Sequence, residues 1–284
     1  MYEKLMRQTP FASIQKTLSS LIPPELLQHL PVKWEKIGTV VTIRVSEELT
    51  QYKKIIGKTY AEALGCSTTL NDIGGISGMY RNPVVEVIFG PSTTETIHIE
   101  NGVRFKVDPQ KIMFSSGNMS ERRRMATIAH PDETVVDLFA GIGYFSLPMA
   151  VYSRPKKIVA CEINPIAFSY LQKNVILNHV SSIVEPIFGD NRKTAPKDCA
   201  DRVVAGFLKE PQNFLQVAFE CLRQGKGILH FHELVPAESI PTQPLAHIEM
   251  VAQHFHRSIE LLNVTNVKSY APRIHHVVLD VRIS

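Results

Sequence analysis

The fold of this chain is decided by one stretch, Val135-Val136-Asp137-Leu138-Phe139-Ala140-Gly141-Ile142-Gly143. Its β-branched start is typical of a buried strand, and the small residues that follow allow the sharp turn in which such a strand ends. Backbone N–H groups in this turn can approach a bound nucleotide, so Asp137, Gly141 and Gly143 are candidate cofactor-binding residues. The turn by itself does not identify the cofactor, because nucleotide-dependent oxidoreductases also place glycines after a strand.

Strand-like and helix-like segments alternate around this turn. The expected strands are Thr134–Leu138, Lys157–Cys161, Val184–Phe188, Arg202–Gly206 and Gly227–Phe231, and the expected helices are Glu121–Ala129, Phe145–Val151, Pro165–Asn178 and Phe214–Leu222. This alternation predicts an α/β, Rossmann-like fold with a parallel sheet and helices on both faces. A helix over Leu245–Phe255 and strands over Ile259–Val267 and His276–Arg282 are expected to close the sheet with an antiparallel pair.

The first third of the chain changes character often and predicts a smaller mixed α+β domain with antiparallel pairing. Its expected strands are Gly38–Val45, Val84–Phe89, Thr96–Ile99 and Val103–Val107, with a helix over Glu47–Gly65. The sequence therefore predicts two domains, an N-terminal domain over residues 1–112 and a catalytic domain over residues 113–284.

Composition sets wide limits on function. The 284 residues carry 31 Lys and Arg against 27 Asp and Glu, a net charge of +4, which permits contact with nucleic acid without requiring it. No apolar run approaches the roughly 20 residues that cross a bilayer, and Met1-Tyr2-Glu3-Lys4 starts no signal peptide, so a soluble cytoplasmic protein is expected. The four scattered cysteines form no Cys-x-x-Cys pair, so neither a metal site nor a disulfide framework is expected.

Two further polar sites follow the next expected strands. Glu162 ends the second parallel strand, where a carboxylate can accept hydrogen bonds from the ribose hydroxyls of a nucleoside. Asp190 and Asn191 follow the third strand and could hold the edge of an adenine base. Each has an ordinary explanation in isolation, a solvated acid at a helix start and a turn. Together with Asp137 they lie at the carboxyl ends of three successive strands, which indicates one ligand site.

The glycine pattern also separates two kinds of chemistry. Gly141 and Gly143 are followed by Tyr144-Phe145-Ser146, so the third glycine of the dinucleotide-binding pattern is missing. Group transfer from S-adenosylmethionine is therefore favoured over hydride transfer.

Several segments resemble one family, the class I S-adenosylmethionine-dependent enzymes that modify position 37 of tRNA. They are Gly75–Glu86, His98–Gly102, Phe114–Arg122, Asp137–Phe145 and Val267–Pro272, and the resemblance covers the chain from about Pro31 onward. It implies a class I methyltransferase fold, S-adenosylmethionine as group donor, and tRNA as partner. The expected target is the anticodon loop of phenylalanine tRNA, the N-terminal domain is expected to bind tRNA, and a monomer is expected.

The resemblance implies roles for individual residues. The family's cofactor contacts fall on Ser115, Arg122, Glu162, Asp190 and Asn191. Arg122 would supply a fixed cation for the carboxylate of the cofactor, with Ser115 as a small donor beside it. Without the resemblance, Arg122 would be one more exposed basic residue of a helix.

Two chemistries occur in this family. One branch methylates N1 of guanosine, and the other transfers the 3-amino-3-carboxypropyl group of S-adenosylmethionine to a tricyclic base, 4-demethylwyosine. Gly117 replaces an arginine typical of the methylating branch, and Gly206-Phe207-Leu208 replaces its Asn-Leu-Pro motif. These departures favour aminocarboxypropyl transfer and would make room for the methionine arm of the cofactor. A guanosine N1-methyltransferase and a non-catalytic tRNA-binding protein stay open as alternatives, although intact Asp137, Glu162 and Asp190 argue against the second.

Transfer to a ring carbon requires that the base lose a proton afterwards. Glu121 matches a catalytic position of the methylating branch and is a candidate base, although an acid that stabilises a helix start is an equal explanation. His230 and His232 lie on an expected strand and are predicted to be packed structural residues. Tyr80 and Phe207 could stack on a base, and the candidate phosphate contacts are Arg81, Arg104, Lys106, Arg123, Arg124, Lys209, Lys268 and Arg273.

Overall fold

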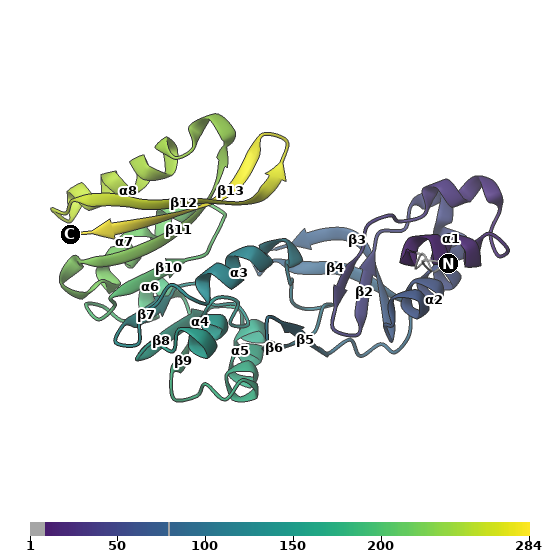
Figure 1. Cartoon of the computed structure of the whole chain (residues 1–284), viewed down its shortest axis with the longest axis horizontal. Helices are drawn as coiled ribbons and strands as arrows, with labels where there is room; N and C mark the ends of the chain where they lie inside the picture. The colour runs from purple at the N-terminus through teal and green to yellow at the C-terminus, as the bar shows by residue number, and fades with distance from the viewer. Residues whose placement is uncertain (1–8, 79) are drawn as a thin grey trace, which may run out of the picture. The chain divides into compact units, whose positions relative to one another are not determined.

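The computed structural model describes residues 9–78 and 80–284 and divides the chain into two compact units (Figure 1). One unit runs up to Ile99 and includes Lys106–Phe114, and the other comprises Glu100–Phe105 with Ser115–Ser284. The segment Met1-Tyr2-Glu3-Lys4 and Met79 lie outside the described residues.

The N-terminal unit combines helices with a four-stranded sheet in the order β1-β2-β3-β4. Its elements are α1 (Pro10–Leu18), η1 (Pro24–His29), β1 (Glu35–Ile37), β2 (Val40–Ile43), η2 (Glu47–Tyr52), α2 (Lys53–Leu64), β3 (Thr68–Ser77) and β4 (Asn82–Phe89). The β1/β2 and β3/β4 pairs are antiparallel as predicted, whereas β2 and β3 are parallel. Ile14 of α1, Val41 of β2 and Ile56 of α2 are fully buried in one apolar core, which accounts for the packing of helices on the sheet.

Two local predictions in this unit have different bounds in the structure. The predicted strand Gly38–Val45 is shortened to β2, Val40–Ile43, because Gly38 turns the chain between β1 and β2 with a φ of +55°. A Cβ there would lie only 2.2 Å from Oγ1 of Thr96, so the turn needs glycine for space as well as for conformation. The predicted helix Glu47–Gly65 begins as a 3-10 helix, becomes α-helical at Lys53 and ends, as predicted, at a left-handed Gly65.

Strand β3 is not among the predicted strands. Its residues include Asn71, Asp72, Gly74 and Gly75, which are depleted in strands. Pairing on both sides, with β2 and β4, compensates for that poor propensity, and an irregularity between Asp72 and Gly75 accommodates the glycines.

The second unit contains a seven-stranded sheet in the order β12-β13-β11-β10-β7-β8-β9. Its elements are η3 (Ser116–Asn118), α3 (Met119–Met125), β7 (Thr134–Asp137), α4 (Ser146–Tyr152), β8 (Lys157–Glu162), α5 (Pro165–Leu177), β9 (Val184–Phe188), α6 (Asn191–Thr194), β10 (Arg202–Ala205), η4 (Pro211–Phe214), α7 (Leu215–Cys221), η5 (Arg223–Gly225), β11 (Gly227–Pro236), η6 (Ala237–Ser239), α8 (Thr242–His254), β12 (Ile259–Ala271) and β13 (Ile274–Ile283). The hairpin β5 (Thr96–Glu100) and β6 (Val103–Val107) forms a separate two-stranded sheet, and its residues are divided between the two units.

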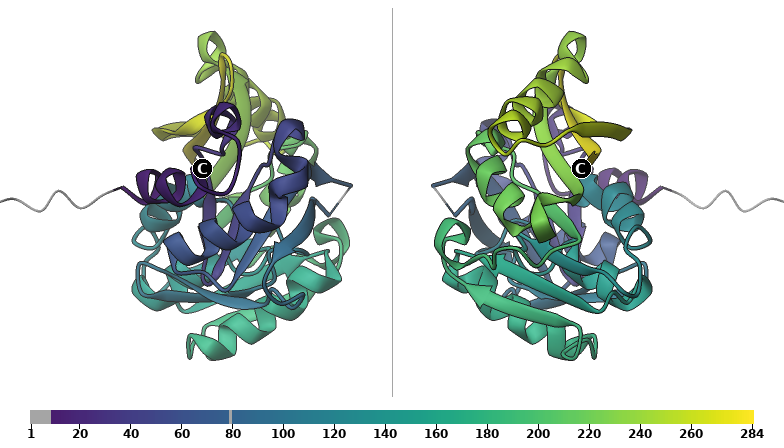
Figure 2. Two further views of the ribbon diagram at one scale, coloured as in Figure 1. Left: turned by 90° about the vertical axis from the view of Figure 1, so that its right-hand side faces the viewer. Right: turned by 90° about the vertical axis from the view of Figure 1, so that its left-hand side faces the viewer.

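Five strands of the large sheet are parallel, and the antiparallel pair β12/β13 closes it, as predicted. From β7 the chain proceeds to β8 and β9 on one side, and then returns to β10 on the other side of β7. Because parallel crossovers are right-handed, this reversal places the helices on opposite faces of the sheet (Figure 2). Ligands of open α/β sheets bind at such a reversal, outside the carboxyl ends of the strands.

Candidate active site

The turn after β7 is made by two glycines with left-handed backbone angles. φ is +59° at Gly141 and +102° at Gly143, conformations that other residues rarely adopt. A Cβ at Gly143 would lie 2.5 Å from Cγ of Leu147, so close packing against α4 also requires glycine. The turn thereby keeps the backbone at the carboxyl edge of the sheet free of side chains at these two positions.

Asp137 holds this turn from inside. Its side chain is completely buried, and its two oxygens accept hydrogen bonds from the backbone N–H of Phe139 at 3.2 Å and the hydroxyl of Ser146 at 2.7 Å. Burial raises the pKa of the Asp137 carboxyl to about 6, although both hydrogen bonds act in the opposite direction. Asp137 therefore shapes the turn, and direct contact with a cofactor stays a prediction.

Glu162 links the end of β8 to the same turn. Its Oε2 accepts from the N–H of Gly141 at 2.7 Å, and its Oε1 accepts from the N–H of Asn164 at 2.6 Å. Burial raises the pKa of the Glu162 carboxyl, and the hydrogen bonds from the backbone of Asn164, Gly141 and Ile163 counteract that rise. A carboxylate offers about four acceptor sites, so Glu162 can hold the turn and still accept from a ribose hydroxyl.

The polar residues after β9 differ from each other in their surroundings. Asp190 caps α6 and binds the guanidinium of Arg192 with both oxygens, and hydrogen bonding to Arg192 holds the pKa of Asp190 below its usual range. Asn191 is buried, and its Nδ2 donates to the carbonyl of Leu138 at 2.7 Å. Its Oδ1 is buried and has no hydrogen-bond partner among the described residues. An unsatisfied buried acceptor is costly, and an amino group of a ligand would satisfy it.

Backbone hydrogen bonds join these strand ends. Ala140 donates to the carbonyl of Cys161, and Gly189 donates to the carbonyl of Glu162, both at 2.9 Å. Together with the bond from Asn191 to Leu138, they bring three of the sequence-predicted positions into one site, the glycine turn, Glu162 and Asn191.

Arg122 lies in a buried ion pair. Its Nε and Nη2 donate to the two carboxylate oxygens of Glu100 at 2.8 and 2.6 Å, and its Nη1 donates to the carbonyl of Ser115 at 2.9 Å. The side chain is 2% exposed, so the alternative of an exposed helical arginine is wrong. Glu100 already balances its charge, which makes Arg122 an anchor for the Ser115 backbone.

Lys268 occupies a place that the sequence did not predict. Its Nζ donates to the hydroxyl of Ser115 at 2.8 Å, and a Cβ at Gly117 would lie 3.2 Å from the same nitrogen. The absence of a side chain at Gly117 thus leaves room for Lys268, which is half-buried. Only the position of β12, far along the chain, brings this amine to Ser115.

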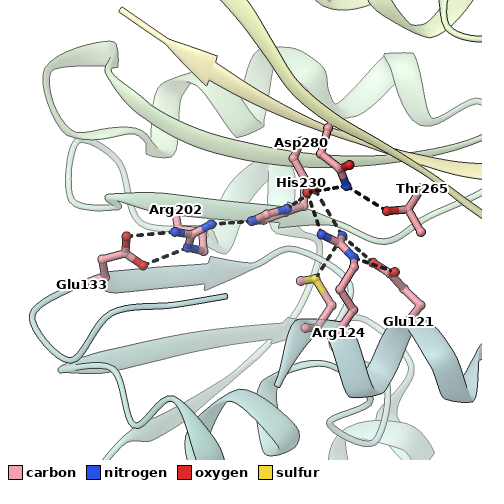
Figure 3. Close-up of polar contacts among 9 residues, drawn as sticks. Glu121, Arg124, Glu133, Arg202, His230, Thr265 and Asp280 are labelled. Carbon is pink, nitrogen blue, oxygen red and sulfur yellow. Dashed lines mark hydrogen bonds and ion pairs between the residues drawn. The ribbon is translucent and has the colours of Figure 1, made fainter. Parts of the chain in front are cut away.

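Glu121 belongs to a network of charged and polar side chains that crosses the sheet (Figure 3). Its carboxylate is fully buried, and both oxygens accept from the guanidinium of Arg124, at 2.9 and 2.7 Å. Arg124 also donates to both oxygens of Asp280, at 2.6 and 3.1 Å. The predicted role of Glu121 as a base is untested by this geometry, in which one guanidinium engages both of its oxygens.

From Asp280, this network of side chains continues through His230 on β11 to Arg202 on β10. Nε2 of His230 lies 2.6 Å from Nη1 of Arg202, which in turn binds both oxygens of Glu133 (Figure 3). A guanidinium can only donate, so Nε2 accepts, and Nδ1 carries the proton that is donated to Asp280 at 2.5 Å. Burial lowers the pKa of His230, which agrees with this neutral tautomer. The predicted structural role of His230 is confirmed by its burial and by these contacts.

Aromatic rings line the end of β10. A Cβ at Gly206 would lie 3.0 Å from the ring of Phe145, so an asparagine at this position would push that ring aside. Phe207 stacks on Phe139 with ring centroids 5.0 Å apart, and Phe214 meets both rings edge-on. One face of Phe207 is therefore already covered by protein.

Other expectations concern ions and membranes. All four cysteines are free, and the described residues contain no cluster of acidic, histidine and cysteine side chains arranged for a metal ion. Within residues 9–78 and 80–284, no helix has the length and apolar character that crossing a membrane requires.

A parallel sheet with a glycine turn after its first strand and polar residues after the next two defines a class, the class I S-adenosylmethionine-dependent transferases. The family model described as the TRM5/TYW2 methyltransferase domain matches residues 96–261, and the model described as the TYW2 N-terminal domain matches residues 14–94. The chain belongs to the TYW2 family. The predicted fold class and the resemblance to tRNA position-37 enzymes are thereby confirmed.

Both branches of the family have relatives of this chain. It is 40% identical to the tRNA(Phe) (4-demethylwyosine(37)-C(7)) aminocarboxypropyltransferase of Pyrococcus horikoshii, over 95% of this chain and 96% of the relative. It is 36% identical to the tRNA (guanine(37)-N(1))-methyltransferase Trm5b of Pyrococcus abyssi, over 93% of this chain and 78% of the relative. The crystal structure of P. horikoshii TYW2 in complex with MeSAdo, methylthioadenosine, superposes with a TM-score of 0.86 at 38% identity, over 96% and 98% of the two chains.

Proposed function

We propose that this chain transfers the 3-amino-3-carboxypropyl group of S-adenosylmethionine to 4-demethylwyosine at position 37 of phenylalanine tRNA, with release of methylthioadenosine. The similarity to the P. horikoshii aminocarboxypropyltransferase carries this proposal, because it extends over both units and 95% of the chain. Methylthioadenosine, bound in the related crystal structure, is what S-adenosylmethionine becomes when it loses this group. The methyltransferase alternative is less favoured because Gly117 and Gly206 lack the polar side chains of that branch.

The described residues fit the adenosine half of the donor. The bare backbone of Gly141 and Gly143 can lie against it, and Glu162 keeps acceptor capacity for ribose hydroxyls. The buried Oδ1 of Asn191 would accept a hydrogen bond from the amino group of adenine. Asp190 would act beside it by capping α6.

The amino acid end of the donor fits the region of Ser115. Lys268 already donates to the hydroxyl of Ser115, so an amine and a hydroxyl together face one point, which suits a carboxylate. Arg122 would then act indirectly, because it holds the backbone of Ser115 while its charge is balanced by Glu100. Asp137 would maintain the glycine turn.

The group transferred depends on which carbon next to sulfur faces the base. When bound, the sulfonium of the donor makes each attached carbon electrophilic, so orientation selects the product. Gly117 leaves room for Lys268, and Gly206 leaves room for Phe145. The absence of side chains at these two positions opens space near the proposed position of the donor carboxylate and at the end of β10.

The N-terminal domain, predicted over residues 1–112, would bind the tRNA body. None of the proposed cofactor contacts lies in it, so a role in recognising the large substrate is its most economical use. Exposed basic residues of the second unit, Arg104, Arg123, Lys209 and Arg273, would contact phosphates near the anticodon loop.

One experiment tests the proposed function. The protein is incubated with S-adenosylmethionine labelled on the methyl or on the carboxyl carbon, and with phenylalanine tRNA carrying guanosine or 4-demethylwyosine at position 37. We expect the carboxyl label to enter only the tRNA that carries 4-demethylwyosine, with one methylthioadenosine formed for each label transferred. Methyl label on guanosine would establish the methyltransferase instead, and cofactor binding without either transfer would indicate a binding protein.

A further inference from the structure

Two buried histidines form a polar contact that is separate from the network of charged and polar side chains around Glu121 and His230. Nδ1 of His232 on β11 lies 3.0 Å from Nε2 of His276 on β13, and each residue is 1% exposed. The outer nitrogens, Nε2 of His232 and Nδ1 of His276, are buried and have no hydrogen-bond partner among the described residues. Burial without partners is costly for polar atoms, so this arrangement calls for a reason beyond packing.

The contact between the rings fixes what the outer nitrogens can do. One proton lies between Nδ1 of His232 and Nε2 of His276, and each neutral ring carries one proton in total. Whichever ring donates, one outer nitrogen has a free lone pair and the other has an N–H. The state in which His232 donates becomes the other state when Nε2 of His232 takes up a proton, the shared proton passes to Nε2 of His276, and Nδ1 of His276 loses its own proton. The pair is neutral at the start and at the end of this sequence.

The histidine pair lies near the carboxyl edge of the sheet, the edge at which the donor is proposed to bind. β10 ends opposite Phe231, so His232 is the first residue of β11 beyond that strand end. Its ring centroid lies 5.1 Å from that of Phe145, the ring that fills the space next to Gly206. On the other side, His276 is paired in register with Lys268 of β12.

We propose that His232 contacts the acceptor base and accepts the proton that the reacting ring carbon of that base loses. His276 then passes a proton on from His232. This role rests on the proposed function. The ring carbon forms a bond to the γ-carbon of the aminocarboxypropyl group, and the γ-carbon–sulfur bond breaks with its electron pair on sulfur. The C–H electron pair then restores the aromatic ring, and the proton passes to the lone pair of His232. The pair returns to neutrality by releasing its far proton to water as the products leave.

The surroundings keep the histidine pair neutral and its lone pair available. Burial lowers the pKa of both rings to about 3, and the cations nearby act in the same direction. The charged and titratable groups that face the two rings are His230, Arg124 and Asp280 around His232, and Lys268 and Glu121 around His276. A weak base suffices here, because a ring that has gained a carbon substituent and still holds its proton is a strong acid.

Glu121 is the competing candidate for this proton. Both of its oxygens accept from Arg124, Arg124 donates to Asp280, and Asp280 accepts from His230. Proton uptake by Glu121 would therefore disrupt a continuous set of polar contacts. The histidine pair can take up a proton without breaking any of these contacts.

The test uses the full chain and tricyclic phenylalanine tRNA with hydrogen or deuterium on the accepting ring carbon. His232→Gln keeps polarity but cannot take up a proton, and His275→Gln is the matched control on the neighbouring position of β13, whose side chain bonds Asn266 instead. In single turnovers, we expect His232→Gln to slow transfer about 100-fold or more, as for loss of a general base. A deuterium isotope effect absent from the wild type should then appear, while methylthioadenosine affinity and the His275→Gln rate stay within about 2-fold.

Each outcome decides the role of the histidine pair. Slower transfer with an isotope effect supports it, and the same result for His276→Gln supports the relay. Slower transfer without an isotope effect, or an unchanged rate, overturns it. If the wild type transfers no carboxyl label to tricyclic tRNA, the proposed function itself fails, which the wild-type reaction shows before any variant is measured.

Discussion

The two sides of the large sheet treat buried charge differently. On the cofactor side, β7 to β9, Asp137 and Glu162 accept hydrogen bonds mainly from backbone N–H groups of adjacent turns. On the ion-pair side, β10, β11 and β13, the side chains of Arg202, His230 and Asp280 bind other side chains. The first arrangement shapes turns and keeps acceptor capacity for a ligand, whereas the second uses its charges to fasten strands and α3 together. Buried charge therefore serves binding on one side and stability on the other.

The largest expected effect breaks the ion-pair side. In Asp280→Asn, an amide nitrogen replaces one of two oxygens that accept from His230, Arg124 and Asn263, and Arg124 loses one of its two carboxylate partners. Removing one partner of a buried pair costs about 3–5 kcal/mol, so we expect the free energy of unfolding of the second unit to fall by that amount. Methylthioadenosine affinity should change less than about 3-fold, because its proposed contacts lie on the cofactor side.

The chain offers an internal control for this measurement. Trp34, the single tryptophan, packs edge-on against Tyr60 in the N-terminal unit. In urea titrations, tryptophan fluorescence then follows that unit, and circular dichroism of the whole chain includes the second one. A loss of stability that both probes report equally, or that neither reports, would contradict the inference that Asp280 stabilises the second unit specifically.

The second effect concerns pH on the cofactor side. The native pKa of Asp137, about 6, exceeds the ordinary value of 3.8 for an aspartate, so the native state binds this proton more tightly than the unfolded state. Its contribution to stability is greatest below pH 4 and is lost as pH rises to about 6, a change of about 3 kcal/mol. Asp137→Asn should lack this slope, since the hydroxyl of Ser146 can reverse its hydrogen bond.

The pH dependence of stability in Asp280→Asn should differ from that in Asp137→Asn. Hydrogen bonds from His230 and Arg124 hold the pKa of Asp280 well below its usual range, although burial alone would raise it. Wild-type stability from Asp280 is therefore present above about pH 4 and is lost as pH falls. In unfolding free energies measured from pH 2 to 7, the deficit of Asp280→Asn relative to wild type should shrink below pH 4, whereas the difference between Asp137→Asn and wild type should change between pH 4 and 6. The same pH dependence for both variants would refute the distinction.

The cofactor side could largely be predicted from the sequence, because its determinants are local. A strand, a glycine turn and an acid after the following strand are each written within a few residues, and the order of parallel strands brings them to one edge. The aromatic stack of Phe139 on Phe207 was not predicted, because it depends on the pairing of β10 with β7.

The ion-pair side and the histidine pair could not be predicted in the same way. His230 meets Asp280, and His232 meets His276, only through the antiparallel register of β11 and β13. Alternation predicted burial of these histidines but not their partners. Lys268 reaches Ser115 for the same reason, since the position of β12 is set by pairing with β13 and not by any local motif.

The smallest expected effect tests whether a carboxylate on the cofactor side serves the ligand more than the fold. Glu162→Gln keeps one oxygen, so the side chain can hold one backbone N–H but loses a charged acceptor for ribose. A hydrogen bond to a charged group is worth roughly 2 kcal/mol, which predicts about 30-fold weaker methylthioadenosine binding by calorimetry. Removing a buried charge offsets the lost backbone bond, so the free energy of unfolding should change by less than about 1 kcal/mol. Glu185→Gln on β9, whose surface pair with Lys157 is half-exposed, is the matched control and should change neither quantity. If Glu162→Gln instead lost stability as Asp280→Asn is expected to, with affinity intact, then both sides of the sheet would use charge for fastening and the ribose role of Glu162 would be wrong.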